Sequence, residues 1–123
     1  MQPTTTLDPQ FLRAVVLLTG FKPHRMRRVQ AALLMLGFTG QDYTAADIPD
    51  ELTEGSRHIA GAATGSLIAI GLLTVTRREK SPEAKAKGRK LDVLRLTSIE
   101  KAKCWLRENQ FEIPTETNQL QLV

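Results

Sequence analysis

The sequence predicts an α+β domain that is mainly helical, with one β-hairpin between its last two helices. Apolar residues recur at helical spacing over most of residues 9–70 and again after residue 97, whereas the period changes to two on both sides of a Lys-rich segment. A chain of 123 residues is long enough for one packed core. We expect a single domain over residues 1–123, with its core at about 24–109 and less ordered tails at 1–7 and 110–123.

The first two helices are expected to begin near residues 9 and 24. Asp8 can cap the free backbone N–H groups of the first helix, Pro9 suits its first position, and Gly20 follows its last apolar residues. The second helix runs from His24 to about Gly37, and its apolar stripe is so wide that little polar surface remains. This second helix is therefore predicted to lie near the centre of the domain.

A short helix and a longer one are expected next. Thr44 with Asp47 three residues later is typical of a capping box, which predicts a short helix through about Leu52, bounded or kinked by Pro49. The longer helix is predicted from about residue 56 to residue 70. Four of its residues have the spacing of a core-facing stripe: Ile59, Ala63, Leu67 and Ile70.

Alternating residues predict two strands around the Lys-rich segment. Leu73 and Val75 alternate with threonines, and residues 91–96 repeat the period of two. Pro82 and Gly88 supply residues that favour turns in the connecting loop. The chain therefore forms a hairpin with a basic tip, in a sheet of two or three strands.

A capping box formed by Thr97 and Glu100 predicts the last helix, which ends near Asn109. Ala102 and Leu106, with Ile99, are expected to face the core, and Trp105 to pack beside them. Beyond residue 109 the apolar period is lost and Pro114 would break a helix.

The formal net charge of +4 is unevenly distributed along the chain. Four basic residues lie within residues 22–28, and seven lie within residues 77–90 against two acids. Between residues 29 and 76, five acids face one arginine. Separate basic and acidic regions suit a polyanionic partner, although solvated surfaces with no partner can carry the same charges.

The order helix, short helix, turn, helix, strand, long basic loop, strand, helix is that of a winged helix-turn-helix domain. Short segments at the element boundaries add to it: Ser56-Arg57, Ile70-Gly71-Leu72-Leu73, and Leu94-Arg95-Leu96-Thr97 before Glu100-Lys101. Over residues 26–106 the chain resembles MarR-type transcriptional regulators. The resemblance implies a double-stranded DNA-binding protein, with the helix at about 56–70 in the major groove and the basic wing at about 77–90 on the backbone or minor groove.

The residues expected to contact DNA lie on these two elements. On the helix they are Ser56, Arg57, His58, Ala62 and Ser66, among which Arg57 is the strongest candidate for reaching base edges. On the wing they are Arg77, Arg78, Lys80, Lys85, Lys87, Arg89 and Lys90, which would neutralise phosphates and make binding depend on salt. Additional candidates for anion contacts, near a helix N-terminus, are Arg25, Arg27 and Arg28.

Other classes of protein fit the sequence less well. We find no catalytic constellation, no cofactor motif and no metal site, because His24 and His58 lack metal-ligand spacing with each other or with Cys104. The longest apolar run is too short to span a bilayer, the N-terminal residues lack the pattern of a signal peptide, and a single cysteine suits a reducing compartment, so we expect a cytoplasmic protein.

The sequence also bears on which partners the domain has. Apolar surface on the first and last helices favours a homodimer formed through them. The acids of the short helix would oppose DNA binding if they faced phosphates. In that case the winged helix would be a protein–protein interaction module in a larger assembly.

Overall fold

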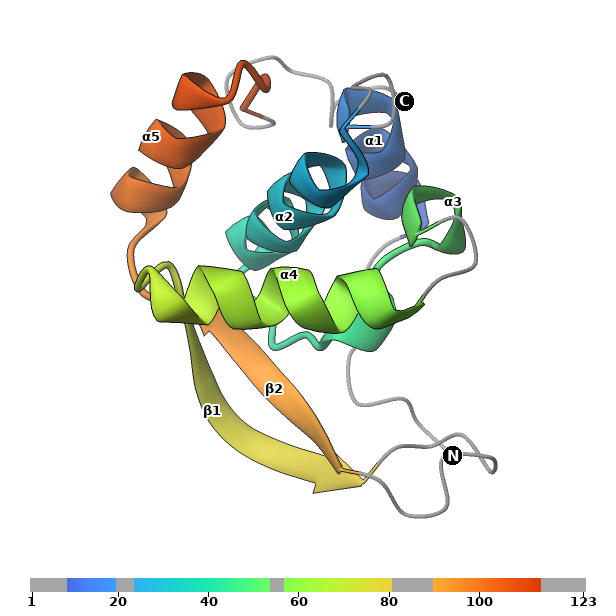
Figure 1. Ribbon diagram of the computed structural model, residues 1–123, viewed down its shortest axis with the longest axis vertical. Helices are drawn as coiled ribbons and strands as arrows, with labels where there is room; N and C mark the ends of the chain where they lie inside the picture. The colour runs from blue at the N-terminus through green and yellow to red at the C-terminus, as the bar shows by residue number, and fades with distance from the viewer. Residues whose placement is uncertain (1–8, 20–23, 54–56, 81–89, 114–123) are drawn as a thin grey trace.

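The computed structural model describes residues 9–19, 24–53, 57–80 and 90–113, and Figure 1 draws the remaining residues in grey. The described chain is mainly helical with a small two-stranded antiparallel sheet, which confirms the predicted α+β, mainly helical class. Its elements are α1 (Pro9–Thr19), α2 (Arg25–Leu36), η1 (Gly37–Thr39), η2 (Ala45–Asp47), α3 (Asp50–Thr53), α4 (Arg57–Ala69), β1 (Leu73–Lys80), β2 (Lys90–Leu96) and α5 (Ile99–Glu108).

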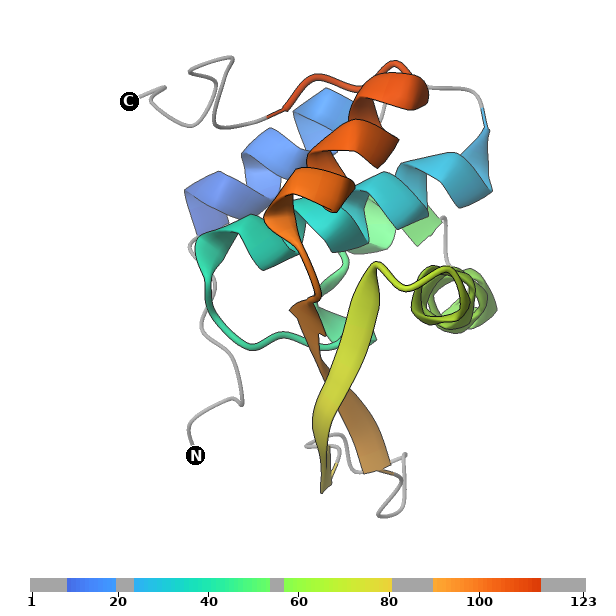
Figure 2. The same cartoon turned by 90° about the vertical axis from the view of Figure 1, so that its left-hand side faces the viewer.

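Helix α2 lies at the centre of the domain, as its wide apolar stripe predicted. It packs against α1 on one side and α4 on the other (Figure 2). Every residue from Arg28 to Leu36 is buried. His24 is the N-cap, and its Nδ1 accepts a hydrogen bond from the backbone N–H of Arg27 at 3.4 Å. The helix therefore provides the surface on which the other helices are assembled.

The segment predicted as one short helix at 44–52 forms two shorter elements. Thr44 and Asp47 form the predicted capping box, but they cap the 3-10 turn η2. The proline ring of Pro49 has no N–H to donate, so the turn does not continue into an α-helix. A new turn, α3, begins at Asp50, and it buries Leu52 and Thr53. The segment is thus divided at Pro49, the residue at which a boundary or kink was predicted.

Helix α4 ends one residue before Ile70, which corrects the predicted core-facing stripe. Gly71 has φ of +84°, its N–H bonds to Ile68 O, and the N–H of Leu72 bonds to Leu67 O. This is a Schellman motif, in which the residue after the left-handed glycine covers the last turn. Leu72 is accordingly buried, whereas Ile70 is 60% exposed.

Strands β1 and β2 pair antiparallel as predicted, from Leu73 opposite Leu96 to Lys80 opposite Lys90. A bulge at Thr76 interrupts the register, so Val75 faces Leu94 while Arg77 faces Val93. Tyr43 forms an isolated antiparallel bridge with Leu94, and its backbone O accepts the Leu94 N–H at 2.7 Å. The hairpin is thereby attached to the segment before η2.

Helix α5 is capped by Ser98, not by Thr97 as predicted. Ser98 accepts from the Lys101 N–H, whereas the Thr97 hydroxyl donates to Gly71 O and ties α5 to the end of α4. Ala102 and Leu106 are buried, but Ile99 in the first turn is 51% exposed, because it lies beyond the edge of the core. Cys104 is also exposed.

The packed chain extends past the predicted core boundary at residue 109. Phe111 and Ile113 are buried. The Phe111 N–H bonds to Leu106 O, and its ring stacks on Trp105 with centroids 6.2 Å apart. Phe111 and Ile113 therefore belong to the core, while residues 114–123 of the predicted tail lie outside the described residues.

Candidate nucleic-acid interface

Helix α4 and the hairpin, the two elements expected to contact DNA, lie side by side. In Figure 1 the hairpin descends from below α4, and the turned view of Figure 2 again shows it next to the helix, which is seen end-on. A groove of about 240 Å³ runs between them, lined by Ala45, Gly61, Thr64, Gly65, Ile68, Leu91 and Asp92. Helix α4 and the hairpin therefore border the same groove.

From Ala60 onward, the outward face of α4 is made of small side chains. Its exposed residues are His58, Gly61, Ala62, Gly65 and Ala69. A Cβ atom added at Gly61 or Gly65 would meet no atom within 4 Å, so this face is open on the side of the groove. A large ligand can therefore approach the backbone of α4 more closely here than it could approach a helix with longer side chains.

Ser66, a predicted DNA contact, is turned toward α2. Its hydroxyl accepts from Gln30 Nε2 at 2.8 Å and donates to Ala63 O at 2.8 Å. Since the single hydroxyl proton is already donated, Ser66 contributes no free donor to the outer face of α4. The spacing of four residues between Ala62 and Ser66 could not show this contact, because the partner of Ser66, Gln30, lies on another helix.

The arginines at the base of the hairpin are held by acids. Arg77 bonds to Asp42 Oδ2 and to Glu79, each at 2.7 Å, and Arg95 Nη2 lies 3.4 Å from Asp42 Oδ1. The hydrogen bond from Arg77 lowers the pKa of Asp42, and the same bond raises the pKa of Arg77. Arg78 pairs with Asp92 at 2.9 Å. Three arginines thus balance three carboxylates, and the base carries no net charge.

The positive excess of the wing therefore lies at its far end. Lys80 is opposite Lys90 where the described ladder stops, and the two are connected by residues 81–89. Within residues 80–90 the sequence has five basic residues against one acid. The predicted contacts Lys85, Lys87 and Arg89 lie outside the described residues, as does Ser56. Arg57 begins α4, at the end of that helix from which base contacts were expected.

The three arginines of α2 lie in different environments. Arg27 Nη1 donates to Gln30 Oε1 at 3.0 Å, and its guanidinium lies 5.8 Å from the ring centroid of Trp105. Arg28 is buried and Arg25 is exposed. Arg27 therefore joins α2 to α5, a role that its sequence position gave no sign of.

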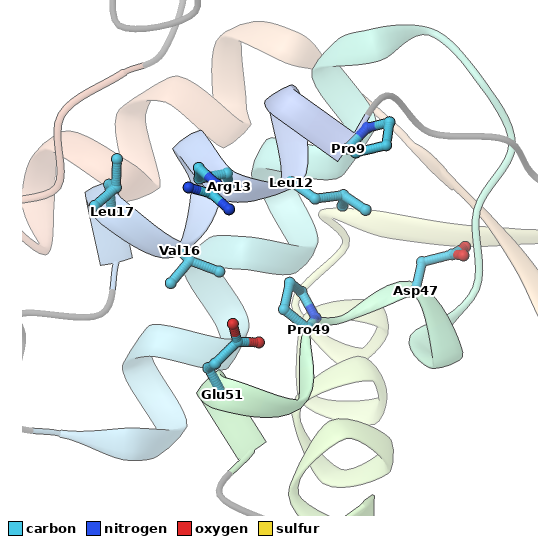
Figure 3. Close-up of a pocket in the computed structure, with 8 residues that line it drawn as sticks. All are labelled: Pro9, Leu12, Arg13, Val16, Leu17, Asp47, Pro49 and Glu51. Carbon is cyan, nitrogen blue, oxygen red and sulfur yellow. The ribbon is translucent and has the colours of Figure 1, made fainter.

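Two of the acids in segment 44–53 border a second groove, between α1 and α3 (Figure 3). Asp47 and Glu51 line it together with Pro9, Leu12, Arg13, Val16, Leu17 and Pro49, and its volume is about 370 Å³. Neither acid lines the groove between α4 and the hairpin. These two carboxylates thus lie on the α1 side of the domain.

Within the described ranges, no three His, Cys, Asp or Glu side chains are grouped to hold a metal ion. In the same part of the chain, every helix is too short or too polar to cross a membrane. Comparison with protein-family models, with curated proteins and with solved structures found no match.

Proposed function

We propose that the domain is a winged helix-turn-helix of the MarR-like type that binds double-stranded DNA as a small transcriptional regulator. In this proposal α4 enters the major groove and the hairpin follows the adjacent backbone or minor groove. The observation that carries it is the shared groove, in which an open helix face lies beside a hairpin whose far end is cationic.

The shape of α4 supports this function. A helix that inserts into a groove about 12 Å wide must keep its outward side chains short or use them for base contacts. Gly61, Ala62 and Gly65 meet the first requirement, and Arg57 and His58 in the first turn are the candidates for the second. With so few polar groups on the helix, affinity would come mainly from phosphates.

The charge distribution supports it as well. The basic residues at 80–90 are carried by a strand pair that extends away from the helices (Figure 1). Asp47 and Glu51 border the groove beside α1, so they would not oppose phosphates bound at α4. This position of Asp47 and Glu51 favours DNA binding over the alternative, in which the domain is a protein–protein interaction module.

The test is duplex binding followed by fluorescence anisotropy at several salt concentrations. Replacing Lys85, Lys87 and Arg89 by alanine should reduce the slope of log affinity against log salt by about 2 to 3, since each lost phosphate contact contributes about 0.9. The matched control replaces three cations of α5, Lys101, Lys103 and Arg107, and should keep the slope within about 1.

A second variant tests α4 itself. Gly65→Leu puts a bulky side chain on the open face, where its Cβ would meet no atom within 4 Å, and it raises helix propensity. We expect a loss of DNA affinity of about tenfold or more, with unchanged or higher thermal stability. Cys104→Leu on the exposed face of α5 is the control. No duplex binding at low salt, or equal losses in variants and controls, would instead favour the protein-interaction module.

A further inference from the structure

A third groove lies between α5 and the residues that follow α4. Its volume is about 310 Å³, and it is lined by Ile70, Leu72, Glu100, Lys101, Cys104, Trp105 and Glu108. The Thr97 N–H donates to Leu72 O at 3.1 Å, and the Thr97 hydroxyl donates to Gly71 O. These bonds fix the start of α5 beside the end of α4 (Figure 1), so the fold holds the two sides of the groove together.

The apolar part of the lining is held by contacts outside the groove. Trp105 stacks on Phe111 with ring centroids 6.2 Å apart, and the Arg27 guanidinium lies over the same indole, 5.8 Å from its centroid. Leu72 is buried, whereas Ile70 is 60% exposed. An apolar surface that is already ordered loses little conformational entropy when it binds a ligand. This part of the groove therefore suits the apolar body of a ligand.

The charged part of the lining is not balanced. Glu100 and Glu108 are exposed, four positions before and after Cys104, so the three residues share one face of α5. Lys101 is the one cation in the lining, against these two carboxylates. Among the described residues, none of the three charged side chains forms an ion pair at 4.0 Å or less. A positive charge on the ligand would complement this excess of negative charge.

We propose that this groove binds a small organic cation, with its apolar body on the apolar lining and its positive group beside Glu100 and Glu108. Small-molecule sites commonly combine an apolar lining with a few polar groups that fix the orientation of the ligand. An anion of the same shape would face two carboxylates and only one ammonium, that of Lys101. A neutral ligand would gain the apolar contacts alone. The charge of the ligand therefore decides which one binds best.

The inference goes beyond the proposed function and does not rest on it. The groove beside α5 and the groove between α4 and the hairpin share no lining residue. The organic cation and DNA would therefore be bound by separate residues.

The chain has two natural reporters of this groove, because its single tryptophan and its single cysteine both line it. The probe is adamantylmethylammonium, compared with neutral adamantylmethanol and anionic adamantanecarboxylate, which share its rigid apolar cage. Quenching or enhancement of Trp105 fluorescence measures each dissociation constant. We expect roughly 1 mM or lower for the cation. The alcohol should bind about fivefold more weakly or less tightly still, since it lacks two exposed ion pairs, and the carboxylate more weakly than the alcohol. Saturation with the cation should also slow alkylation of Cys104 by iodoacetamide.

Two variants separate the charged part of the lining from the apolar part. Replacing Glu100 and Glu108 together by glutamine should reduce the preference for the cation over the alcohol to less than about twofold, with the affinity for the alcohol unchanged. Ile70→Ser should weaken binding of both ligands about threefold or more. The matched control replaces Glu51 and Glu112, two exposed acids outside the lining, by glutamine. It makes the same change of net charge and should keep the preference within about twofold of wild type.

Circular dichroism of each variant separates loss of folding from loss of binding. Equal affinities of the wild-type chain for the cation and the alcohol would overturn the proposal. So would an unchanged preference after replacement of Glu100 and Glu108, an equal loss of preference in the control, or cation binding that leaves the alkylation of Cys104 unchanged. Failure of DNA binding is measured separately by anisotropy and would leave this result unaffected.

Discussion

The guanidinium of Arg77 on β1 donates to the carboxylate of Asp42, 35 positions earlier in the chain, with Nη1 and Oδ2 2.7 Å apart. Asp42 immediately precedes Tyr43, whose backbone pairs with Leu94 of β2. The ion pair and this bridge together attach the hairpin to the segment before η2. The same carboxylate also faces Arg95, so one acid restrains two arginines at the base of the wing.

Asp42→Asn should strengthen DNA binding. The substitution releases Arg77 and Arg95 from a carboxylate that competes with phosphates, and it raises the net charge by one. We expect a gain in affinity of several-fold at low salt and a salt slope steeper by about 1, measured by anisotropy. The free energy of unfolding should fall by less than about 1 kcal/mol, since the pairs are exposed.

The matched control for this prediction is Glu108→Gln on α5, which makes the same change of charge at an exposed position. It should alter the affinity for DNA by no more than about twofold to threefold, which corresponds to about 0.5 kcal/mol. If both variants bind DNA equally well, the gain reflects net charge alone and Asp42 does not restrain the wing.

Tyr43→Phe should extend the stability of the domain at high pH. Burial raises the pKa of the Tyr43 phenol above its ordinary value of 10.0. The unfolded chain can therefore ionise this group at a pH where the folded chain cannot. The stabilisation is complete below about pH 10 and is lost as the pH rises further. Between about pH 7 and about pH 11, the free energy of unfolding measured with urea should fall less in the phenylalanine variant than in the wild type.

Two further measurements check the environment of Tyr43. Among the described residues its hydroxyl has no hydrogen-bond partner although the side chain is fully buried, so at pH 7 the substitution should leave stability unchanged or raise it by about 1 kcal/mol. The chain has one tyrosine, so phenol absorbance reports Tyr43 alone. Titration of this absorbance near pH 10 in the folded protein would contradict the assignment.

Gly37→Ala should destabilise the domain by about 1 to 3 kcal/mol, the usual cost of overpacking. A Cβ at Gly37 would overlap Leu96 Cγ and lie 2.9 Å from Leu96 Cδ1, so the Leu96 side chain or β2 would have to shift. The measurement is thermal or urea unfolding. Gly65→Ala is the control. Its added Cβ would meet no atom within 4 Å, so the substitution should stabilise α4 by about 0.5 to 1 kcal/mol. Equal effects of the two substitutions on stability would contradict the close approach of Gly37 to Leu96.

Gln30→Leu should weaken the attachment of α4 to α2. Gln30 is buried, accepts from Arg27 and donates to Ser66, and the leucine can do neither. We expect a loss of about 1 to 2 kcal/mol in the free energy of unfolding. A double-mutant cycle with Ser66→Ala should give a coupling energy of about 0.5 to 1.5 kcal/mol. Simple additivity of the two substitutions would show that the bond at 2.8 Å contributes nothing.

Much of the fold could be predicted because its signals are local. The capping box at Thr44, the change of period after Gly71 and the wide apolar stripe of α2 act within a few residues, and each was found where expected. The errors at Ile70 and Ile99 have a common cause. Spacing identifies a helix face, but where the neighbouring element ends decides whether the last residue on that face is covered.

The candidate site was predictable in part for the same reason. The basic residues at 77–90 and the small residues of α4 are visible in the sequence. The carboxylates that neutralise Arg77, Arg78 and Arg95 are not, because two of the three acids lie 14 or more positions from the arginine they face. Nor could spacing show that Ser66 faces Gln30, 36 positions away.

The amino-acid sequence by itself determined the order of the elements, their approximate ends and the sign of the charge that each one carries, because propensity, capping and periodicity operate over one or two turns of chain. Only the tertiary structure decided which charges meet, that α5 shares a groove with the residues after α4 and that α4 shares a groove with the hairpin. These outcomes depend on contacts between residues far apart in the chain, and such contacts form only when the elements pack around α2.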